Sequence, residues 1–134
     1  SFNSIEEVKY YLKNEYKEPD IIYPDPSYYI SGNSIIFYGN FVDDDLRIWK
    51  VKEFMVKNKY IYEKYYNSEL EKKFPYDKIK RYDIENLDID AISYFFIKTF
   101  RGERFYTGLI NIVVKSGIML KLVERAEQLK NKEK

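Results

Sequence analysis

The sequence contains neither cysteine nor histidine, and these two absences narrow its chemistry more than any other feature of its 134 residues. Without cysteine there are no disulfides, no cysteine-ligated iron–sulfur clusters and no zinc sites of the usual Cys/His kind. Without histidine there is no Ser-His-Asp triad and no Cys-His dyad. Any metal would depend on carboxylates alone, and most familiar hydrolase mechanisms are excluded.

A long hydrophobic run and an excess of one charge are also missing. No apolar stretch approaches the roughly 20 residues that span a bilayer, and the first residues show no signal-peptide core. We therefore expect a cytoplasmic protein without membrane contact. The 23 basic and 22 acidic residues leave a formal net charge of +1, which argues against binding through bulk positive charge. An apolar fraction of 45% suffices for a single domain over residues 1–134.

Most of the chain has helical periodicity. Ser4 and Glu7 have the capping-box spacing and begin an amphipathic helix that we expect to reach about residue 17. One of Asp43, Asp44 and Asp45 is the expected N-cap of a second helix, and Asp88 or Asp90 that of a short, nearly all-apolar one. After the first helix, the predicted helices span residues 45–58, 59–74, 91–99, 104–116 and 118–130.

A convincing strand signal occurs in one place. Two runs of aromatic and β-branched residues, 28–30 and 35–38, flank Ser-Gly-Asn-Ser, which is typical of a hairpin that ends at Gly39-Asn40. The fold class that we predict is therefore mainly α, a helical bundle with one small β-hairpin.

Residues 100–109, Phe-Arg-Gly-Glu-Arg-Phe-Tyr-Thr-Gly-Leu, are the most informative segment for function. If residues 104–116 form one helix, its core face is Phe105, Leu109, Ile112 and Val113, and its opposite stripe is Arg104, Gly108, Asn111 and Lys115. Glycine inside a helix costs roughly 1 kcal/mol and permits close approach. The N-terminal amides of this helix favour an anion. Two interpretations remain open. One is a phosphate site, and the other is a glycine for helix packing with arginines that pair with Glu103 and the Asp-rich segments.

The phosphate interpretation assigns a role to each residue of the segment. Arg101 and the helix N-terminus bind phosphate, and Tyr106 stacks on a base or sugar. Between residues 98 and 134 there are nine basic and four acidic residues, a local charge that suits phosphate binding. The predicted nucleotide or phosphate contacts are Arg101, Arg104, Tyr106, Asn111 and Lys115.

A second, weaker group lies on the predicted helix 45–58. Arg47, Lys50 and Lys57 share one side of it, and Trp49 falls at the edge of its core face. Trp49 is either a half-buried packing residue or a stacking surface for a base, and the cations are either ligand contacts or an ordinary solvated face.

Two acidic features could hold a metal, namely residues 43–45 and the pair Asp88 and Asp90. Both directly precede helices, where aspartate is the expected cap, so we predict no catalytic residue and no enzyme activity of the chain by itself.

The order of elements in the C-terminal half resembles the C-terminal domain of the archaeal and eukaryotic primase large subunit. The resemblance covers roughly residues 88 to 130: a helix, a basic loop, Arg104-x-x-x-Gly-Leu at the start of a helix, then Lys115 and Gly117 before another helix. That domain binds a four-iron–four-sulfur cluster through four cysteines, and this sequence has none. The chain is therefore similar to the PriX family, the cluster-free third subunits of crenarchaeal primases.

The resemblance implies a non-catalytic accessory subunit of a DNA primase. Such a subunit joins the catalytic and large subunits and binds the initiating nucleoside triphosphate, ATP or GTP, or the single-stranded DNA template. Arg104, with Arg101 and Lys115, is carried over from the motif, and no iron–sulfur cluster or other cofactor is expected. The alternative is a structural protein-interaction adaptor without a nucleotide site, because the tyrosines at 60, 62, 65 and 66 cannot all be buried and tyrosine suits interfaces.

Overall fold

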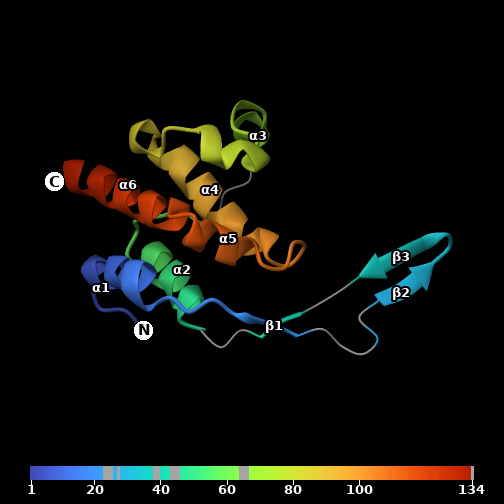
Figure 1. Ribbon diagram of the computed structural model, residues 1–134. Helices are drawn as coiled ribbons and strands as arrows, with labels where there is room; N and C mark the ends of the chain where they lie inside the picture. Colours follow the sequence, from blue (N-terminus) through green and yellow to red (C-terminus); the bar gives the residue numbers. More distant parts are fainter. Residues whose placement is uncertain (23–25, 27, 38–39, 43–45, 64–66, 134) are drawn as a thin grey trace.

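The computed structural model describes residues 1–22, 26, 28–37, 40–42, 46–63 and 67–133 (Figure 1). Helices make up the body of the molecule, and a β-arm leads away from it, so the mainly α class is confirmed. The helices are α1 (Ile5–Tyr10), the π-helix η1 (Tyr11–Glu15), α2 (Arg47–Lys57), α3 (Ser68–Lys73), the 3₁₀-helices η2 (Tyr76–Arg81) and η3 (Ile84–Asn86), α4 (Ile89–Gly102), α5 (Leu109–Lys115) and α6 (Ile118–Lys132).

The first helix begins as its capping signal predicts. The Ser4 hydroxyl accepts the Glu7 amide at 3.2 Å, and the Glu7 carboxylate accepts the amide of Asn3. Ile5, Val8 and Leu12 are buried, which confirms the predicted core face.

Helix α4 is the centre of the body, where it packs against α2, α5, α6 and η2 (Figure 1). Asp88 accepts the Ala91 amide at 2.9 Å, so the first of the two candidate caps is the one used. The apolar run of this helix predicts burial on most sides, and nine residues of α4 are buried. The helix is longer than predicted, because residues 100–102, expected in a loop, continue it.

Two expectations for the middle of the chain are corrected. The predicted helix 59–74 is confined to α3, because Lys59 adopts a φ of +61° and Asn67 starts a new helix by accepting the amides of Glu69 and Leu70. Asp43, Asp44 and Asp45 lie outside the described residues, and the N-cap position of α2 is Leu46.

The predicted hairpin is confirmed as β2 (Tyr28–Ser31) and β3 (Ser34–Phe37), joined by a two-residue loop. Gly32 has the φ of +61° that such a loop needs at its first position. Tyr38 and Gly39, included in the prediction, lie outside the described residues.

A second antiparallel pair, β1 (Asp20–Ile22) with β4 (Asn40–Val42), was not predicted. Asn40 was expected to end the hairpin, yet it opens β4. Strands of three residues carry too short a pattern to be recognised from sequence. The two pairs follow one another along the arm, with the β2–β3 hairpin at its far end (Figure 1).

One hydrophobic cluster holds the body together, with members from Phe2 to Ala126. Ile48, Val51 and Met55 contribute the buried face of α2. Gly117 separates α5 from α6 as expected, with a φ of +84° at the N-cap of α6. In the part of the chain that the structure describes, no helix is both long and apolar enough to cross a membrane.

Candidate functional site

The connection between α4 and α5, residues 103–108, replaces the first turn of the helix predicted for 104–116. Gly108 adopts a left-handed φ of 97° at the N-cap of α5, so the helix begins only at Leu109. The amides of Phe105 and Tyr106 both donate to the carbonyl of Gly102, at 3.0 and 2.8 Å. The Leu109 amide donates to the Tyr106 carbonyl at 3.1 Å, so backbone hydrogen bonds define a tight turn.

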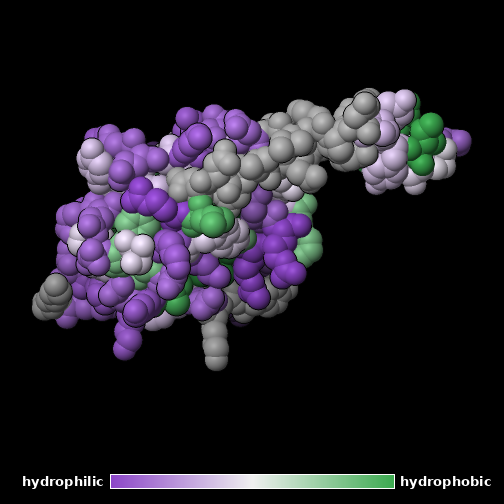
Figure 2. All heavy atoms as spheres, turned by 90° about the horizontal axis from the view of Figure 1, so that it is seen from below, coloured by the Kyte–Doolittle hydropathy of each residue, from purple (hydrophilic) through white to green (hydrophobic). Residues whose placement is uncertain are grey.

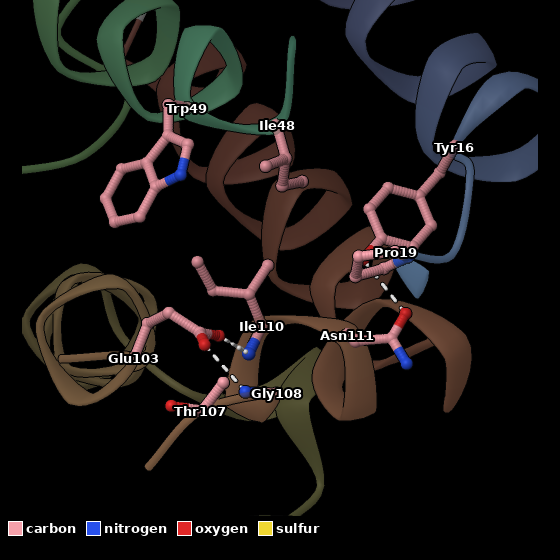
Figure 3. Close-up of a pocket in the computed structure, with 9 residues that line it drawn as sticks. All are labelled: Tyr16, Pro19, Ile48, Trp49, Glu103, Thr107, Gly108, Ile110 and Asn111. Carbon is pink, nitrogen blue, oxygen red and sulfur yellow. Dashed lines mark hydrogen bonds between the residues drawn. The ribbon is translucent and has the colours of Figure 1, made fainter. Parts of the chain in front are cut away.

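The Glu103 carboxylate caps α5 from inside the connection (Figure 3). One of its oxygens accepts the Gly108 amide at 2.6 Å and the other accepts the Ile110 amide at 2.9 Å. A negative side chain at a helix N-terminus satisfies orphan amides and complements the helix dipole. These amides, which we expected to attract a ligand anion, are therefore occupied by the protein's own carboxylate.

The late start of α5 changes which side chains reach solvent. Phe105, predicted in the core, is 90% exposed, and Tyr106 beside it is 60% exposed. Ile112, also predicted in the core, is 43% exposed, whereas Val113 is buried as expected. The core-face prediction fails for Phe105 because that residue precedes the helix whose periodicity was used to place it.

The stripe Arg104, Gly108, Asn111 and Lys115 does not form, because Arg104 lies in the connection and not on the helix. Arg101 is in the last turn of α4, and Lys115 is the last residue of α5. Among the described residues, neither these two cations nor Arg104 has an ion pair or a side-chain hydrogen bond. The alternative in which the arginines pair with Glu103 is not observed, since Glu103 caps α5.

The connection borders two small clefts. The first has a volume of about 180 Å³ and lies between Trp49, Tyr16 and the α5 N-terminus, with Glu103, Thr107 and Gly108 on its wall (Figure 3). The second has a volume of about 200 Å³ and is lined by Arg101, Gly102 and Phe105 together with residues of α4 and Glu71.

A lysine with an acidic partner stands at the second cleft. Burial opposes the charge on Lys98, but its hydrogen bond to Glu71 contributes to a pKa above the ordinary value of lysine. Lys98 therefore stays charged beside Tyr94, whose ring it approaches to 5.5 Å. The second cleft thus combines apolar walls with the Lys98–Glu71 ion pair and the Arg101 guanidinium.

Asn111 has a structural partner on each side of its amide. Its oxygen accepts the Tyr16 hydroxyl at 2.9 Å, and its nitrogen donates to Glu18 at 3.1 Å. Figure 3 shows Asn111 and Tyr16 joined by this hydrogen bond at one side of the first cleft. Asn111 therefore ties α5 to the N-terminal segment and is set apart from Arg101 and Arg104.

The second predicted group has intramolecular partners as well. The Arg47 guanidinium lies 4.6 Å from the ring centre of Tyr11 and 3.6 Å from the Glu15 carboxylate. Lys50 pairs with Glu53 at 3.1 Å. Trp49 is 38% exposed and meets the ring of Phe100 edge-on at 5.3 Å, so it packs at the edge of the core and also faces the first cleft.

Asp88, one of the carboxylates considered as metal ligands, has a structural role. Asp88 caps α4, and Asp43 to Asp45 lie outside the described residues. Within the ranges that the structure covers, no three acidic side chains come together in a way that could hold a metal ion.

Sequence reasoning wrongly placed Phe105 in the core and did not identify Glu103 as the cap of α5. Gly108 was the available signal for both residues. A glycine within an expected helix also fits a left-handed backbone at a helix start. An acidic residue shortly before that glycine, here Glu103, fits a helix cap.

Residues 53–132 match a family described as a family of unknown function, DUF6508. The match contains α3 to α6 and the whole α4–α5 connection, but not the β-arm. Neither a curated protein nor a solved structure matches the chain.

Proposed function

The chain belongs to DUF6508, a family of unknown function, and we propose from the site itself that it is a non-catalytic protein that binds single-stranded nucleic acid or a nucleoside triphosphate. The observation that carries the proposal is the α4–α5 connection, where Phe105 and Tyr106 are exposed next to Arg101 and Arg104, two cations without described partners.

The exposure of Phe105 is a property of an ordered turn. Burying a phenylalanine stabilises a protein by about 1.5 to 3 kcal/mol relative to leaving it in water. Here the Gly102 carbonyl and the Glu103 cap fix the backbone on both sides of the ring. The turn therefore holds the ring in water, and the protein forgoes the free energy of burying it. A ligand that covers the ring would gain that free energy on binding.

The chemistry of the exposed groups matches single-stranded nucleic acid. A base stacked on an aromatic side chain contributes about 1 to 3 kcal/mol, largely independent of sequence. Arginine binds phosphate oxygens through a bidentate fork. Rings and guanidinium groups on one short turn provide both contacts that a nucleotide requires.

The primase context of this proposal rests on the resemblance of residues 88 to 130. The succession α4, the α4–α5 connection, α5, Gly117 and α6 supports it, although Arg104 lies ahead of its helix and not on it. As an accessory subunit, the chain would hold the initiating ATP or GTP, or the template. Metal-bound carboxylates of the catalytic subunit would perform the transfer, and the chain's contribution would be positioning.

A second candidate, a protein-interaction adaptor without a nucleotide site, is favoured by the second cleft. Tyr94, Ile97 and Phe105 form apolar walls there, and Tyr62 elsewhere is 48% exposed. Aromatic residues and arginine are enriched in interfaces, where an anchor side chain fills such a pocket.

Binding of ATP and of an oligo(dT) of about 16 nucleotides by fluorescence anisotropy separates these candidates. We expect the wild type to bind, and Phe105→Ala/Tyr106→Ala to bind at least tenfold more weakly through lost stacking. Arg101→Ala/Arg104→Ala should weaken binding and flatten its dependence on salt between about 50 and 200 mM.

The matched control is Lys78→Ala/Lys80→Ala, which removes two exposed positive charges from η2 and should leave affinity within about twofold. Equal losses in this control would mean that bulk charge, and not the connection, binds the ligand. Absence of wild-type binding would contradict the nucleotide proposal and favour the adaptor.

The primase context has its own test, a reconstituted assay with catalytic and large primase subunits. Arg101→Ala/Arg104→Ala should reduce primer initiation much more than elongation. Equal effects on both steps, or no incorporation of the chain into the complex, would contradict the context without affecting the binding result.

A further inference from the structure

The β-arm contains the longest part of the sequence without charge. Residues 26–42 include no Asp, Glu, Lys or Arg, in a chain of which 34% is charged. Within this segment Tyr29 is 52% exposed, Ile30 69% and Ile35 61%. Figure 2 shows a largely hydrophilic body in this view and hydrophobic residues at the far end of the arm. The arm thus presents apolar side chains to solvent, away from the core.

The hairpin register determines which groups point outward. Cross-strand neighbours share a face, so Ile30 lies beside Ile35 and Tyr29 beside Ile36. A two-residue loop closes on a hydrogen-bonded pair, here Ser31 and Ser34. The next pair, Ile30 and Ile35, is then non-hydrogen-bonded, and its backbone N–H and C=O groups point away from the hairpin along both edges.

Both strands of this hairpin are edge strands. Among the described strands β2 pairs with β3 alone, and the arm holds them away from the helices (Figure 1). Soluble proteins protect such edges with charged side chains, proline or bulges, and residues 28–37 contain neither charge nor proline. An isolated two-stranded hairpin is also only marginally stable in water. The hairpin has the properties of a strand pair that is completed by further strands.

A second copy of the chain meets the requirements for those strands. When a strand pairs antiparallel with its own copy, a charged residue near the twofold axis faces its own like charge, which is destabilising. The β2–β3 hairpin has no charge to repel a copy, and the apolar pair Ile30 and Ile35 would extend one continuous hydrophobic face. A net charge of +1 adds almost no long-range repulsion between two copies.

We propose that two copies of this chain associate edge to edge through their β2–β3 hairpins into a four-stranded antiparallel sheet with twofold symmetry. The dimer places the two helical bodies, each with its α4–α5 connection, at opposite ends of the shared sheet. This inference is independent of the proposed function, because the hairpin lies outside the connection.

Sedimentation of the full-length chain over a range of concentrations tests the association. We expect a monomer–dimer equilibrium for the wild type. Ile30→Lys/Ile35→Lys places like charges across the new sheet and should raise the dimer dissociation constant at least 100-fold. Ile112→Lys, the same change at a 43% exposed isoleucine of α5, should leave that constant within about threefold.

A second measurement does not depend on the lysine variants folding. Because the chain has no cysteine, Ile35→Cys, Ile30→Cys and Ile112→Cys each carry a single thiol. Mild oxidation should give disulfide-linked dimers of at least one hairpin variant and none of Ile112→Cys. A wild type that stays monomeric at every concentration, a dimer that survives both lysines, or a hairpin that binds neutral vesicles instead of its copy would overturn the proposal.

Discussion

At the scale of single residues, Tyr76 shows how burial sets the chemistry of a side chain. Its hydroxyl lies 2.6 Å from the Thr99 hydroxyl, which itself donates to the Phe95 carbonyl at 2.7 Å. Tyr76 is therefore the donor of this pair. Burial raises the pKa of Tyr76 from 10.0 to about 12.

The raised pKa predicts a loss of stability at alkaline pH. The folded state keeps the Tyr76 proton at pH values where the unfolded chain has lost it, so the stabilisation is complete below pH 10 and disappears as pH rises toward about 12. We expect the free energy of unfolding to fall by about 1 kcal/mol by about pH 11 from this group. Urea unfolding at several pH values measures the fall.

Tyr76→Phe is the control, because all other tyrosines and lysines titrate equally in both proteins. It should cost about 1 kcal/mol at neutral pH through the lost hydrogen bond, and this gap should close by about pH 11. A gap that stays constant with pH would mean that Tyr76 titrates normally.

Phe95 and Phe105 show the limit of residue-level prediction. Phe95 is fully buried, with its ring 5.0 Å from that of Tyr94 and 5.6 Å from that of Tyr82, whereas Phe105 is 90% exposed. Both residues are phenylalanine and equally hydrophobic, so the backbone conformation around each one decides whether its ring is buried or exposed. The apolar run around Phe95 correctly predicted its burial. Gly108, three residues after Phe105, is consistent with a turn at that position.

At the scale of elements, the N-terminus of α5 depends on one carboxylate. We expect Glu103→Ala to destabilise the protein by about 1 to 2 kcal/mol, because the amides of Gly108 and Ile110 lose their acceptors. Thermal or urea unfolding measures the loss, and hydrogen exchange at these two amides should become faster.

Glu85→Ala removes an exposed glutamate from η3 and should change stability by less than about 0.5 kcal/mol. The loss of stability in Glu103→Gln should lie between those of Glu103→Ala and Glu85→Ala, since the glutamine side chain keeps one oxygen acceptor. If Glu103→Ala and Glu85→Ala were equally mild, the helix N-terminus would be satisfied by water and its amides would be open to a ligand anion.

Elements whose signals are local were predicted well. The Ser4 and Asp88 caps, the Gly32-Asn33 loop and the apolar stripes of α1, α2 and α6 all arise from contacts within one or two turns of chain. The start of the predicted helix 59–74 was misplaced, because Lys59 has a left-handed φ and the capping residue of this segment is Asn67, eight positions later. Residues at helix ends depend on their neighbours in space, so the α4–α5 boundary was misplaced.

At the scale of the whole molecule, an ion pair joins the first helix, α1, to the last helix, α6. The Lys9 ammonium on α1 lies 2.6 Å from the Glu127 carboxylate on α6, 118 residues away, and both side chains are less than one-third exposed. The hydrogen bond to Glu127 raises the pKa of Lys9 above 10.5 even though burial acts against the charge. Lys9 is therefore charged throughout the neutral range.

A double-mutant cycle of Lys9→Met and Glu127→Gln measures this long-range coupling. We expect a coupling energy of about 1 kcal/mol, above that of exposed pairs because partial burial reduces screening by water and salt. The matched cycle is Lys50→Met with Glu53→Gln, an exposed pair on α2 for which we expect less than about 0.5 kcal/mol. Equal coupling in both cycles would mean that the α1–α6 contact is held by packing alone.

The sequence by itself determined the class of the fold, the position of most helices, the hairpin and the exclusion of cysteine and histidine chemistry, because composition and short-range periodicity contain that information. Only the tertiary structure decided that Glu103 occupies the α5 N-terminus, that Asn111 binds Tyr16, 95 residues away, and that Phe105 faces solvent. These features depend on contacts between segments that folding brings together, and the free energy of such contacts is absent from any local pattern of residues.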